Sequence, residues 1–151
     1  MSGTGKSSAL SLLNRRGFET VDTDTDEWSR WEAGSDGTRD WIWNEDAMNS
    51  LLTTPRDAPL FVAGCKTNQG AFYPLFEHVV LLSAPLEVIL ERVATRSNNP
   101  YGRTSAERAE IVAYVETVEP RLRSSATLVI DATLPLLDVV RQLERLTIDP
   151  L

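Results

Sequence analysis

Apolar residues fall into short clusters that recur along the whole chain and are separated by turn residues. Three clusters are continuous apolar runs, at 60–63, 79–82 and 127–130, and a shorter strand is expected at 18–21. Runs of this length are typical of strands buried on both faces of a sheet. We therefore expect these four segments to build one sheet.

The segments between these runs carry apolar residues at helical spacing. Helices are expected at about 5–16, 71–77, 85–96, 104–120 and from 135 onward. Thr104, with Glu107 three residues later, has the spacing of a capping box that starts a helix. Strands that alternate with helices predict an α/β domain with a mostly parallel sheet covered on both faces, and we expect a single domain over 1–151.

The segment 25–57 departs from this alternation. It is polar and holds all four tryptophans of the chain, which are Trp28, Trp31, Trp41 and Trp43. We expect one or two short helices here, with a loop at 34–37 and with Trp28 and Trp31 on one helical face. The rings either pack this piece onto the sheet or line a pocket that stacks on a flat ring, such as a base or a sugar. Trp28 is the tryptophan that we predict to contact a substrate.

Composition narrows the possible functions. The chain has 151 residues, 42% of them apolar, and a formal net charge of -7, which argues against a nucleic-acid partner bound through its phosphates. The single cysteine, Cys65, excludes an internal disulfide and suggests no zinc cluster. No apolar run approaches the ~20 residues of a membrane span, and no signal peptide is evident, so we expect a cytoplasmic protein and no membrane partner.

The opening residues carry the clearest chemical motif. Ser2-Gly3-Thr4-Gly5-Lys6-Ser7-Ser8 matches most of the phosphate-binding loop, or Walker A pattern, in which glycines let backbone amides surround an anion at a helix start. In that pattern the lysine reaches the β- and γ-phosphates of ATP, and the hydroxyl after it binds Mg²⁺. The residues predicted to bind nucleotide are Gly3, Thr4, Gly5, Lys6, Ser7 and Ser8, with Lys6 also catalytic and Ser7 on the metal. The alternative is a glycine-rich helix cap with a solvated lysine.

One part of the pattern lies outside the chain. Its first glycine falls just before Met1, and the strand that normally feeds the loop is also absent. That strand is central in a doubly wound sheet, and without it two strand edges are exposed. We expect Met1 to be an internal methionine of a longer natural protein, from which this chain lacks roughly 6 to 10 residues.

Further candidates follow the ends of the predicted strands, where ligands bind in parallel sheets. Asp22 and Asp24 lie on the same side of an extended segment. One carboxylate can orient or deprotonate an acceptor hydroxyl, while the other, assigned to Asp22, holds a metal-bound water. Gly64 and Lys66 are predicted to approach the substrate. Solvated turn carboxylates and a solvated lysine are the alternatives.

Taken in order, these motifs resemble the small P-loop kinases. The resemblance rests on the Ser-Gly-Thr-Gly-Lys-Ser-Ser loop, on Asp22-Thr23-Asp24, and on the helix end from Glu91-Arg92 to Arg96 with a lid after it. The group includes nucleoside monophosphate, shikimate and gluconate kinases. The stretch 96–107 looks most like bacterial kinase-like ATPases of unassigned substrate that are labelled AAA-type ATP-binding proteins.

The resemblance implies a three-layer α/β/α fold with a five-stranded parallel sheet, ATP and Mg²⁺ as cofactors, and an acceptor-binding insert at 25–57. It implies a lid at 97–104 whose Arg103 reaches the transferring phosphate, while Arg96 contacts the adenine or a phosphate. It places the adenine near Asp131 and Thr133. A solvated surface arginine remains the alternative for Arg103 and for Arg96.

The function expected from the residues and the resemblance is phosphoryl transfer from ATP to a small metabolite. The acceptor bears a hydroxyl or a phosphate, as nucleosides, nucleotides and sugar acids do, and the protein is a monomer or homodimer. One alternative is a regulatory ATPase or switch, in which the tryptophan-rich segment meets a protein partner. Another is a truncated fold that binds nucleotide weakly.

Overall fold

The protein is described by a computed structural model that covers residues 3–97 and 99–148. The chain divides into two compact units, one made of Met1–Ala9 with His78–Leu151 and the other of Leu10–Glu77. The first described element, helix α1 (Lys6–Arg15), begins in one unit and ends in the other. The expected single domain over 1–151 stays a prediction.

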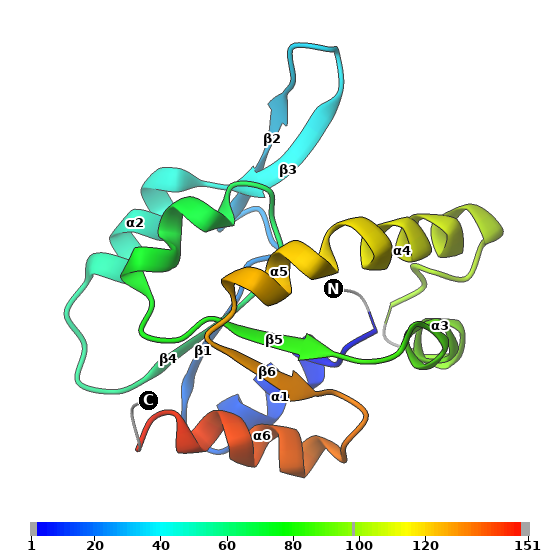
Figure 1. The fold of residues 1–151 in the computed structure, drawn as a ribbon. Coiled ribbons are helices and arrows are strands. Elements are labelled where there is room, and N and C mark those ends of the chain that lie inside the picture. Colours follow the sequence, from blue (N-terminus) through cyan, green and yellow to red (C-terminus); the bar gives the residue numbers. More distant parts are fainter. Residues whose placement is uncertain (1–2, 98, 149–151) are drawn as a thin grey trace. The chain divides into compact units, whose positions relative to one another are not determined.

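The first unit is built around a parallel strand pair. Strand β5 (Val80–Ser83) pairs with β6 (Leu128–Asp131), in register from Val80 opposite Leu128 to Ser83 opposite Asp131. The helices of this unit are α3 (Leu86–Thr95), α4 (Ser105–Thr117), α5 (Glu119–Ser125) and α6 (Leu136–Arg145). Figure 1 shows α6 on one side of the strand pair and α5 on the other, so the unit has the predicted α/β layering.

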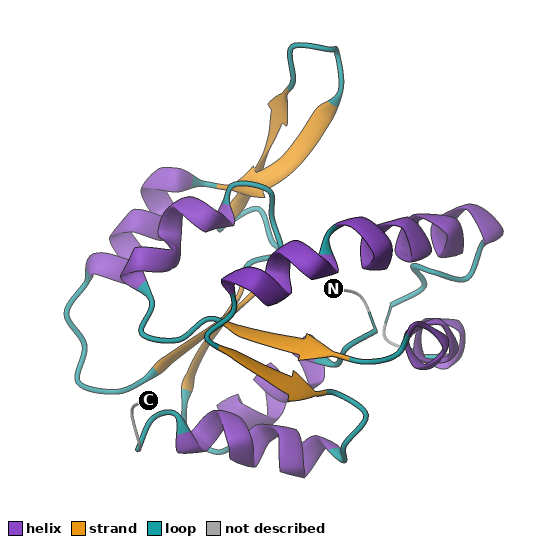
Figure 2. Ribbon diagram, in the orientation of Figure 1, coloured by secondary structure: helices purple, strands orange, loops and turns teal. Residues whose placement is uncertain are grey.

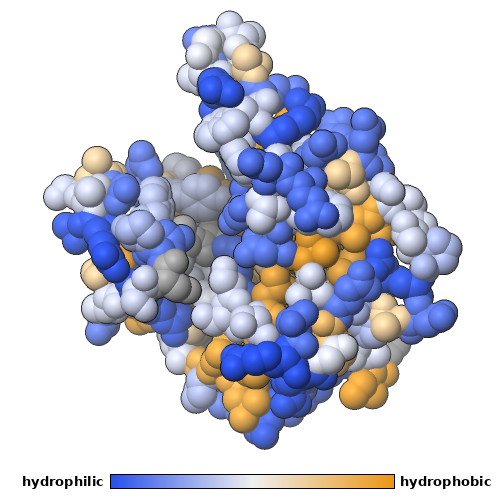
Figure 3. Space-filling view, turned by 180° about the vertical axis from the view of Figure 1, so that it is seen from behind, coloured by the Kyte–Doolittle hydropathy of each residue, from blue (hydrophilic) through white to orange (hydrophobic). Residues whose placement is uncertain are grey.

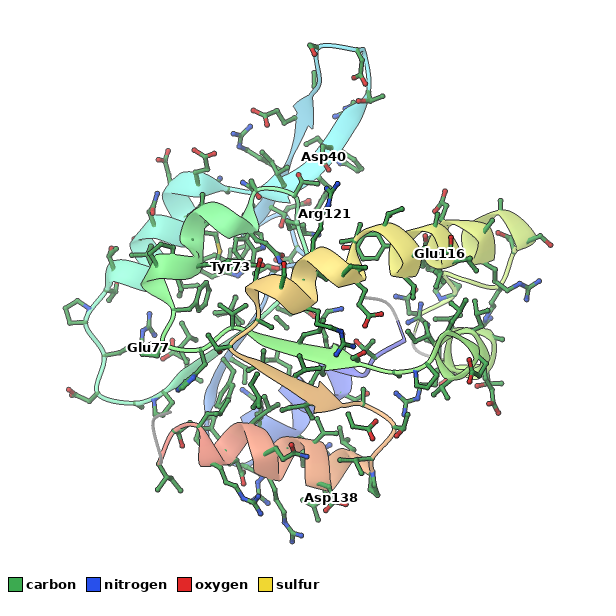
Figure 4. All side chains as sticks on the ribbon, in the orientation of Figure 1. Asp40, Tyr73, Glu77, Glu116, Arg121 and Asp138 are labelled. Atoms are coloured by element: carbon green, nitrogen blue, oxygen red, sulfur yellow. The ribbon has the colours of Figure 1, made fainter. Side chains whose placement is uncertain are left out.

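Helix α6 follows its sequence pattern closely. Val139, Val140 and Leu143 recur at helical spacing and are buried, as predicted, while Asp138 points away from the strands (Figure 4). Leu136 was also expected to point inward but is 38% exposed. It lies in the first turn of α6, directly after Pro135, where the helix has only begun to cover the strands.

The segment predicted as one helix over 104–120 forms two. Helix α4 ends at Thr117, and α5 starts two residues later with Pro120 in its first turn. Proline lacks a backbone N–H and would break a helix interior, but it is tolerated in a first turn, where that group has no partner. The chain therefore starts a second helix at Glu119, and Pro120 lies in its first turn.

The second unit holds the other parallel pair and a hairpin. Strand β1 (Glu19–Asp22) pairs with β4 (Leu60–Ala63), whose bounds match the predicted run. Strands β2 (Ser29–Ala33) and β3 (Arg39–Trp43) form an antiparallel hairpin that extends away from the rest of the unit (Figure 2). Helix α2 (Glu45–Thr53) and a 3-10 helix, η1 (Gln69–Leu75), complete the unit.

The hairpin corrects the prediction of helices in the first part of 25–57. Trp31 and Trp41 lie directly opposite each other on β2 and β3, with ring centroids 4.9 Å apart. Trp31 therefore packs against a ring on the neighbouring strand and not against Trp28 along a helix. The turn is stabilised by Asp36, whose Oδ1 accepts bonds from the amide and hydroxyl of Thr38, and by Gly37 at φ +82°. The predicted loop at 34–37 is this turn, and α2 is a short helix of the kind expected.

The capping box of α4 is present as predicted. The Thr104 hydroxyl accepts from the Glu107 amide at 3.1 Å, and the Glu107 carboxylate accepts from the Thr104 amide at 3.2 Å. These bonds satisfy two backbone or cap donors that would otherwise lack partners at the helix start. They also fix the residue at which the loop before α4 becomes helix.

We predict that Thr104→Ala lowers the free energy of unfolding by about 1 kcal/mol, because it removes the acceptor of the Glu107 amide. Urea denaturation followed by circular dichroism measures the change. Thr117→Ala is the control, since this exposed threonine in the last turn of the same helix only donates back to the Ala113 carbonyl. Equal losses in the two variants would contradict a capping role.

Candidate nucleotide and acceptor sites

The phosphate loop has the backbone that its sequence predicts. Gly3 and Gly5 have φ values of +76° and +89°, a region that disfavours every residue with a Cβ. A Cβ on Gly3 would also lie 2.9 Å from the Ile89 side chain, so both conformation and packing exclude a larger residue. Helix α1 starts directly after Gly5, at Lys6. The backbone amides in the first turn of a helix have no partner within the helix. They point out of its positive end, where they can bind an anion.

Arg92 on α3 connects this loop to the end of β6. Its Nη2 donates to the Ala132 carbonyl at 2.6 Å, and its Nη1 lies 3.4 Å from the Gly3 carbonyl. One half-buried guanidinium thus ties the phosphate loop to the turn after β6. Sequence reasoning assigned Arg92 no role, and its only signal was its place in the helix end that resembles small kinases.

The predicted nucleotide contacts Asp131 and Thr133 form the same turn. Asp131 Oδ1 accepts from the Thr133 hydroxyl at 2.6 Å and from the Thr133 amide at 2.9 Å. These two bonds, helped by the nearby charge of Arg92, hold the pKa of the Asp131 carboxyl below its ordinary value. Through Arg92, the structure therefore brings Asp131 and Thr133 into one connected group with Gly3.

The two arginines predicted for the lid hold the loop that carries them. Arg96 donates from Nε to the Asn99 carbonyl at 3.0 Å and from Nη2 to the Tyr101 carbonyl at 2.7 Å. Arg103 donates to the Arg96 carbonyl at 2.6 Å. Burial, with a smaller contribution from the like charge of Arg103, lowers the pKa of Arg96. Within the described residues neither guanidinium has a carboxylate partner, so the pair adds positive charge to this loop.

The same loop is fixed to the helices on either side of it. Gly102 has φ +97°, and a Cβ there would lie 2.7 Å from the Val93 side chain on α3. Tyr101 donates its hydroxyl to Glu110 on α4 at 2.6 Å, and burial followed by this bond raises the pKa of Tyr101 to about 12. The limits 97–104 of the lid stay a prediction, and Asn98 lies outside the described residues.

In the second unit, the predicted acceptor residues meet where β1 and β4 end. Thr23 is fully buried, and its amide and hydroxyl donate to the Ala63 carbonyl at 3.0 and 2.8 Å. A Cβ on Gly64 would lie only 2.0 Å from the Thr23 hydroxyl oxygen. The Thr23 carbonyl in turn accepts from the Ser29 hydroxyl at 2.6 Å. Because residue 64 has no side chain, Thr23 can pack against the end of β4 while it also binds Ser29 at the start of the hairpin.

The two aspartates that flank Thr23 have different partners. Asp22 Oδ1 accepts from the Asp24 amide at 3.0 Å, which fixes the turn. Asp24 forms an ion pair with Lys66, which follows Gly64 in the chain. The Lys66 side chain is only 10% exposed, and its ammonium lies 5.8 Å from the centroid of the Trp41 ring. The structure therefore brings Asp22, Asp24 and Lys66 together and adds an aromatic wall.

The tryptophan predicted to contact substrate, Trp28, is partly buried and packs against the cluster of Trp43, Met48 and Phe72. Its contact with a substrate stays a prediction. Trp41 is the ring beside Lys66, and sequence reasoning missed it because the hairpin was not expected. The only available signal was the alternation of Trp41 and Trp43, which is typical of one face of a strand.

The loop after β4 is bound to the end of β3. The side chain of Asn68 accepts from the Trp43 amide and donates to the Trp43 carbonyl, each at 3.0 Å, as a neighbouring strand would. Lys66 donates its amide to Gln69, whose side chain donates to Tyr73 (Figure 4). Trp43 Nε1 is the one buried side-chain nitrogen or oxygen of the described chain without a hydrogen-bond partner.

The phosphate loop offers the kind of oxygen ligand that Mg²⁺ takes in such sites. In the described parts of the chain no three His, Cys, Asp or Glu side chains form a metal-binding group. Magnesium in such sites is held by one or two protein oxygens together with water and phosphate oxygens, so no such group is needed. Ser7, in the first turn of α1, provides a hydroxyl of the required kind. Asp22, at the end of β1 in the second unit, stays a predicted metal residue.

Comparisons with known proteins agree with these features. A family model described as an AAA domain matches residues 1–113. The chain belongs to this AAA-domain family. No curated protein matches significantly. In the described residues, no helix of this AAA-domain protein has the length and apolar character needed to cross a bilayer.

Two solved structures are similar to the AAA-domain protein. A shikimate kinase from Acinetobacter baumannii, in complex with shikimate, matches with a TM-score of 0.63 and 18% identity over 97% of this chain and 88% of its own. TT1252 from Thermus thermophilus matches with a TM-score of 0.56 and 20% identity, over 96% and 91%. The fold is therefore that of the small P-loop kinases of the shikimate kinase type, as the sequence motifs predicted.

We predict that Gly64→Ala destabilises the AAA-domain protein by about 1–3 kcal/mol, because the new methyl group overlaps the Thr23 hydroxyl and the backbone must shift. Gly70→Ala is the matched control, since a Cβ there would meet nothing within 4 Å. Thermal and urea unfolding measure both variants. A Gly64→Ala protein as stable as Gly70→Ala would refute the close contact.

We also predict a pH dependence from Asp131. Because its pKa is lowered in the folded state, its ionised form contributes stability above the ordinary carboxyl pKa, and this contribution is lost as the pH falls through the lowered value. Asp131→Asn keeps an acceptor oxygen but no charge. The difference in unfolding free energy between wild type and Asp131→Asn should shrink from pH 7 to pH 3. A difference that stays constant would show that Asp131 is not stabilised as a carboxylate.

Proposed function

We propose that this AAA-domain protein is a small-molecule kinase that transfers the γ-phosphate of ATP to a metabolite bearing a hydroxyl or a phosphate. The observation that carries the proposal is the backbone of the phosphate loop, with left-handed glycines at 3 and 5 and Lys6 at the first helical position. The similarity in fold to a shikimate kinase supports it. The acceptor is of nucleoside, nucleotide or sugar-acid type.

The first set of residues is assigned to ATP. Backbone amides from Gly3 to Ser8 hold the terminal phosphates, and the Lys6 ammonium offsets their negative charge. Bound Mg²⁺ would further neutralise the phosphates, with Ser7 assigned to it as a ligand and Asp22 assigned to a metal-bound water. Arg96 and Arg103 add positive charge where negative charge develops, and Asp131 and Thr133 border the adenine.

The second set is assigned to the acceptor. Asp24 orients the acceptor hydroxyl and takes its proton as the oxygen bonds to the γ-phosphorus, while the bond from that phosphorus to the ADP oxygen breaks. Lys66 holds Asp24 in place through their ion pair. Gly64 adds no side chain beside these residues, because the Thr23 hydroxyl takes the place that its Cβ would occupy.

A regulatory ATPase is the second candidate, and one observation favours it. Trp31 is 52% exposed on the hairpin, and tryptophan is one of the residues enriched at protein–protein interfaces. In that case the protein would hydrolyse or sense ATP and would have no small-molecule acceptor. The two candidates share the ATP-binding residues and differ only in what meets the second unit.

Lys6→Ala should weaken binding of ATP–Mg²⁺ by about ten- to a hundredfold, because it removes a charge-assisted bond worth about 1.5–3 kcal/mol. Isothermal titration calorimetry measures the affinity. Arg15→Ala removes one positive charge from the last turn of the same helix and should leave the affinity close to wild type. Unchanged affinity in Lys6→Ala would overturn the assignment of the phosphate loop.

A screen of metabolites that follows ADP release separates the kinase from the ATPase. We expect one acceptor class to raise ADP release well above the rate without acceptor, and Asp24→Asn to abolish that increase while leaving ATP affinity unchanged. Mass spectrometry of the product identifies the phosphorylated compound. Slow ADP release that is equal for all acceptors would favour the regulatory ATPase.

A further inference from the structure

One face of β3 carries a continuous row of chemically unusual side chains. Arg39, Trp41 and Trp43 alternate along the strand, so they share a face, and Trp31 joins them from the opposite position on β2. The row runs from an exposed cation through a half-buried indole to an indole that is only 4% exposed. It therefore leads from the surface of the hairpin to the predicted acceptor residues Asp24, Gly64 and Lys66.

Contacts along this row connect it to the proposed acceptor residues. The Arg39 guanidinium lies 5.3 Å from the Trp31 ring centroid, and the Trp31 and Trp41 rings meet edge to face at 4.9 Å. The Lys66 ammonium lies 5.8 Å from the Trp41 ring and forms the ion pair with Asp24. An unbroken series of contacts thus links Arg39 at the outer end to Asp24 at the inner end.

Two groups in this row lack the partners that their chemistry calls for. Arg39 has no carboxylate partner within the described residues, whereas Arg30, on the opposite face of the hairpin, is paired with Glu32. The Trp43 indole nitrogen is buried without an acceptor and lies 3.4 Å from the place that a Cβ on Gly64 would occupy. A buried donor without an acceptor is costly, so its position beside the acceptor residues calls for an explanation.

We propose that the face formed by Trp31, Arg39, Trp41 and Trp43, which we name the indole face, binds the planar heteroaromatic ring of the acceptor. The inference rests on the proposed function and narrows the acceptor to a nucleoside or its monophosphate. The base stacks on an indole, Arg39 donates to a carbonyl oxygen of the base, and the Trp43 N–H donates to a further oxygen of the ligand. The sugar hydroxyl then faces Asp24.

The chemistry of the indole face favours a base over a single polyol ring. Every base has a flat π surface that stacks on an aromatic side chain, and its acceptor atoms, which are carbonyl oxygens or ring nitrogens, lie in the plane of the ring, where a guanidinium can reach them. Lys66 and Trp41 stand between Asp24 and Trp31, so a ligand that meets both ends of the row must carry a ring beyond its reacting hydroxyl. A polyol with one saturated ring has no second ring to place there.

A purely structural role for the tryptophans is the competing explanation. The hairpin is exposed from Arg30 to Asp40, and hydrophilic residues dominate its projecting surface (Figure 3), so a cross-strand tryptophan pair would help to hold the strands together. That role needs the rings of Trp31 and Trp41 but gives no use to the Arg39 charge or to the Trp43 N–H. Variants that remove only those two features therefore separate the explanations.

Calorimetric titrations without ATP test the indole face directly. The ligands are adenosine, guanosine, cytidine, uridine and thymidine, the corresponding monophosphates, and the polyols shikimate and myo-inositol. We expect at least one nucleoside or monophosphate to bind and the polyols not to bind. Trp31→Ala should weaken binding about tenfold, whereas Trp31→Phe, which keeps a ring, should have a smaller effect.

Trp43→Phe and Arg39→Gln supply the deciding comparison, with Arg30→Gln as the control on the opposite face. Trp43→Phe removes the five-membered part of the indole with its N–H, so it should weaken ligand binding, and the melting temperature of the same variant reports the packing lost in the core. Arg39→Gln should weaken a nucleoside and its monophosphate to a similar extent, because Arg39 meets the base. A loss confined to the monophosphate would place the phosphate against Arg39 and contradict this assignment.

Three results would overturn the proposal: binding of a polyol without any nucleoside or monophosphate, ligand affinity unchanged in both Trp43→Phe and Arg39→Gln, or a Trp31→Ala effect fully explained by hairpin unfolding in circular dichroism. Failure of the kinase proposal looks different. In that case nucleosides bind the indole face as described, and no phosphorylated product forms when ATP is added.

Discussion

Backbone conformation at Gly3 and Gly5 is the constraint on which the nucleotide-binding part of the structure depends. Both residues are left-handed, and Gly3 is pressed against Ile89 so closely that no side chain fits. This contact places the Gly3 carbonyl beside Arg92, which in turn holds the carbonyl of Ala132 after β6. The phosphate loop, helix α3 and the turn after β6 are distant in the chain. They are therefore held together by contacts that depend on glycine at position 3.

Electrostatics in this unit follow from the same arrangement. Arg92 contributes to the low pKa of Asp131, and the Arg96 and Arg103 guanidinium groups bind carbonyls of their own loop. A protein with a formal net charge of -7 thus concentrates cations in one described region. Locally placed positive charge within an acidic protein is a common basis for specific phosphate recognition, because it avoids non-specific attraction to other polyanions.

The sequence was sufficient for features whose signals are local. The apolar run at 60–63 and the capping box of Thr104 and Glu107 were predicted correctly because each depends on neighbours within a few residues. Phosphate-loop glycines were recognised for the same reason. The family and the fold followed from these motifs, as the matching AAA-domain model and the similar kinase structures show.

Features that depend on distant partners could not be predicted. Asp24 and Lys66 are 42 positions apart, and Arg92 meets a carbonyl 40 positions away, so no local pattern connects them. The hairpin was missed because Trp28 and Trp31 have helical spacing, whereas the partner of Trp31 is Trp41 on the next strand. Trp28 packs against a core cluster whose members lie 15 to 44 positions later in the chain, so its spacing alone could not show that contact.

The way in which the hairpin is attached has a consequence for how such proteins diversify. Its base is fixed by the Asn68 amide on Trp43 and by the Ser29 hydroxyl on Thr23, while every residue from Arg30 to Asp40 is exposed. Insertions or replacements beyond that base would disturb no buried contact of β1 or β4. Natural selection can therefore exchange this segment almost independently of its scaffold, and related chains are free to acquire new ligands by varying about a dozen surface positions.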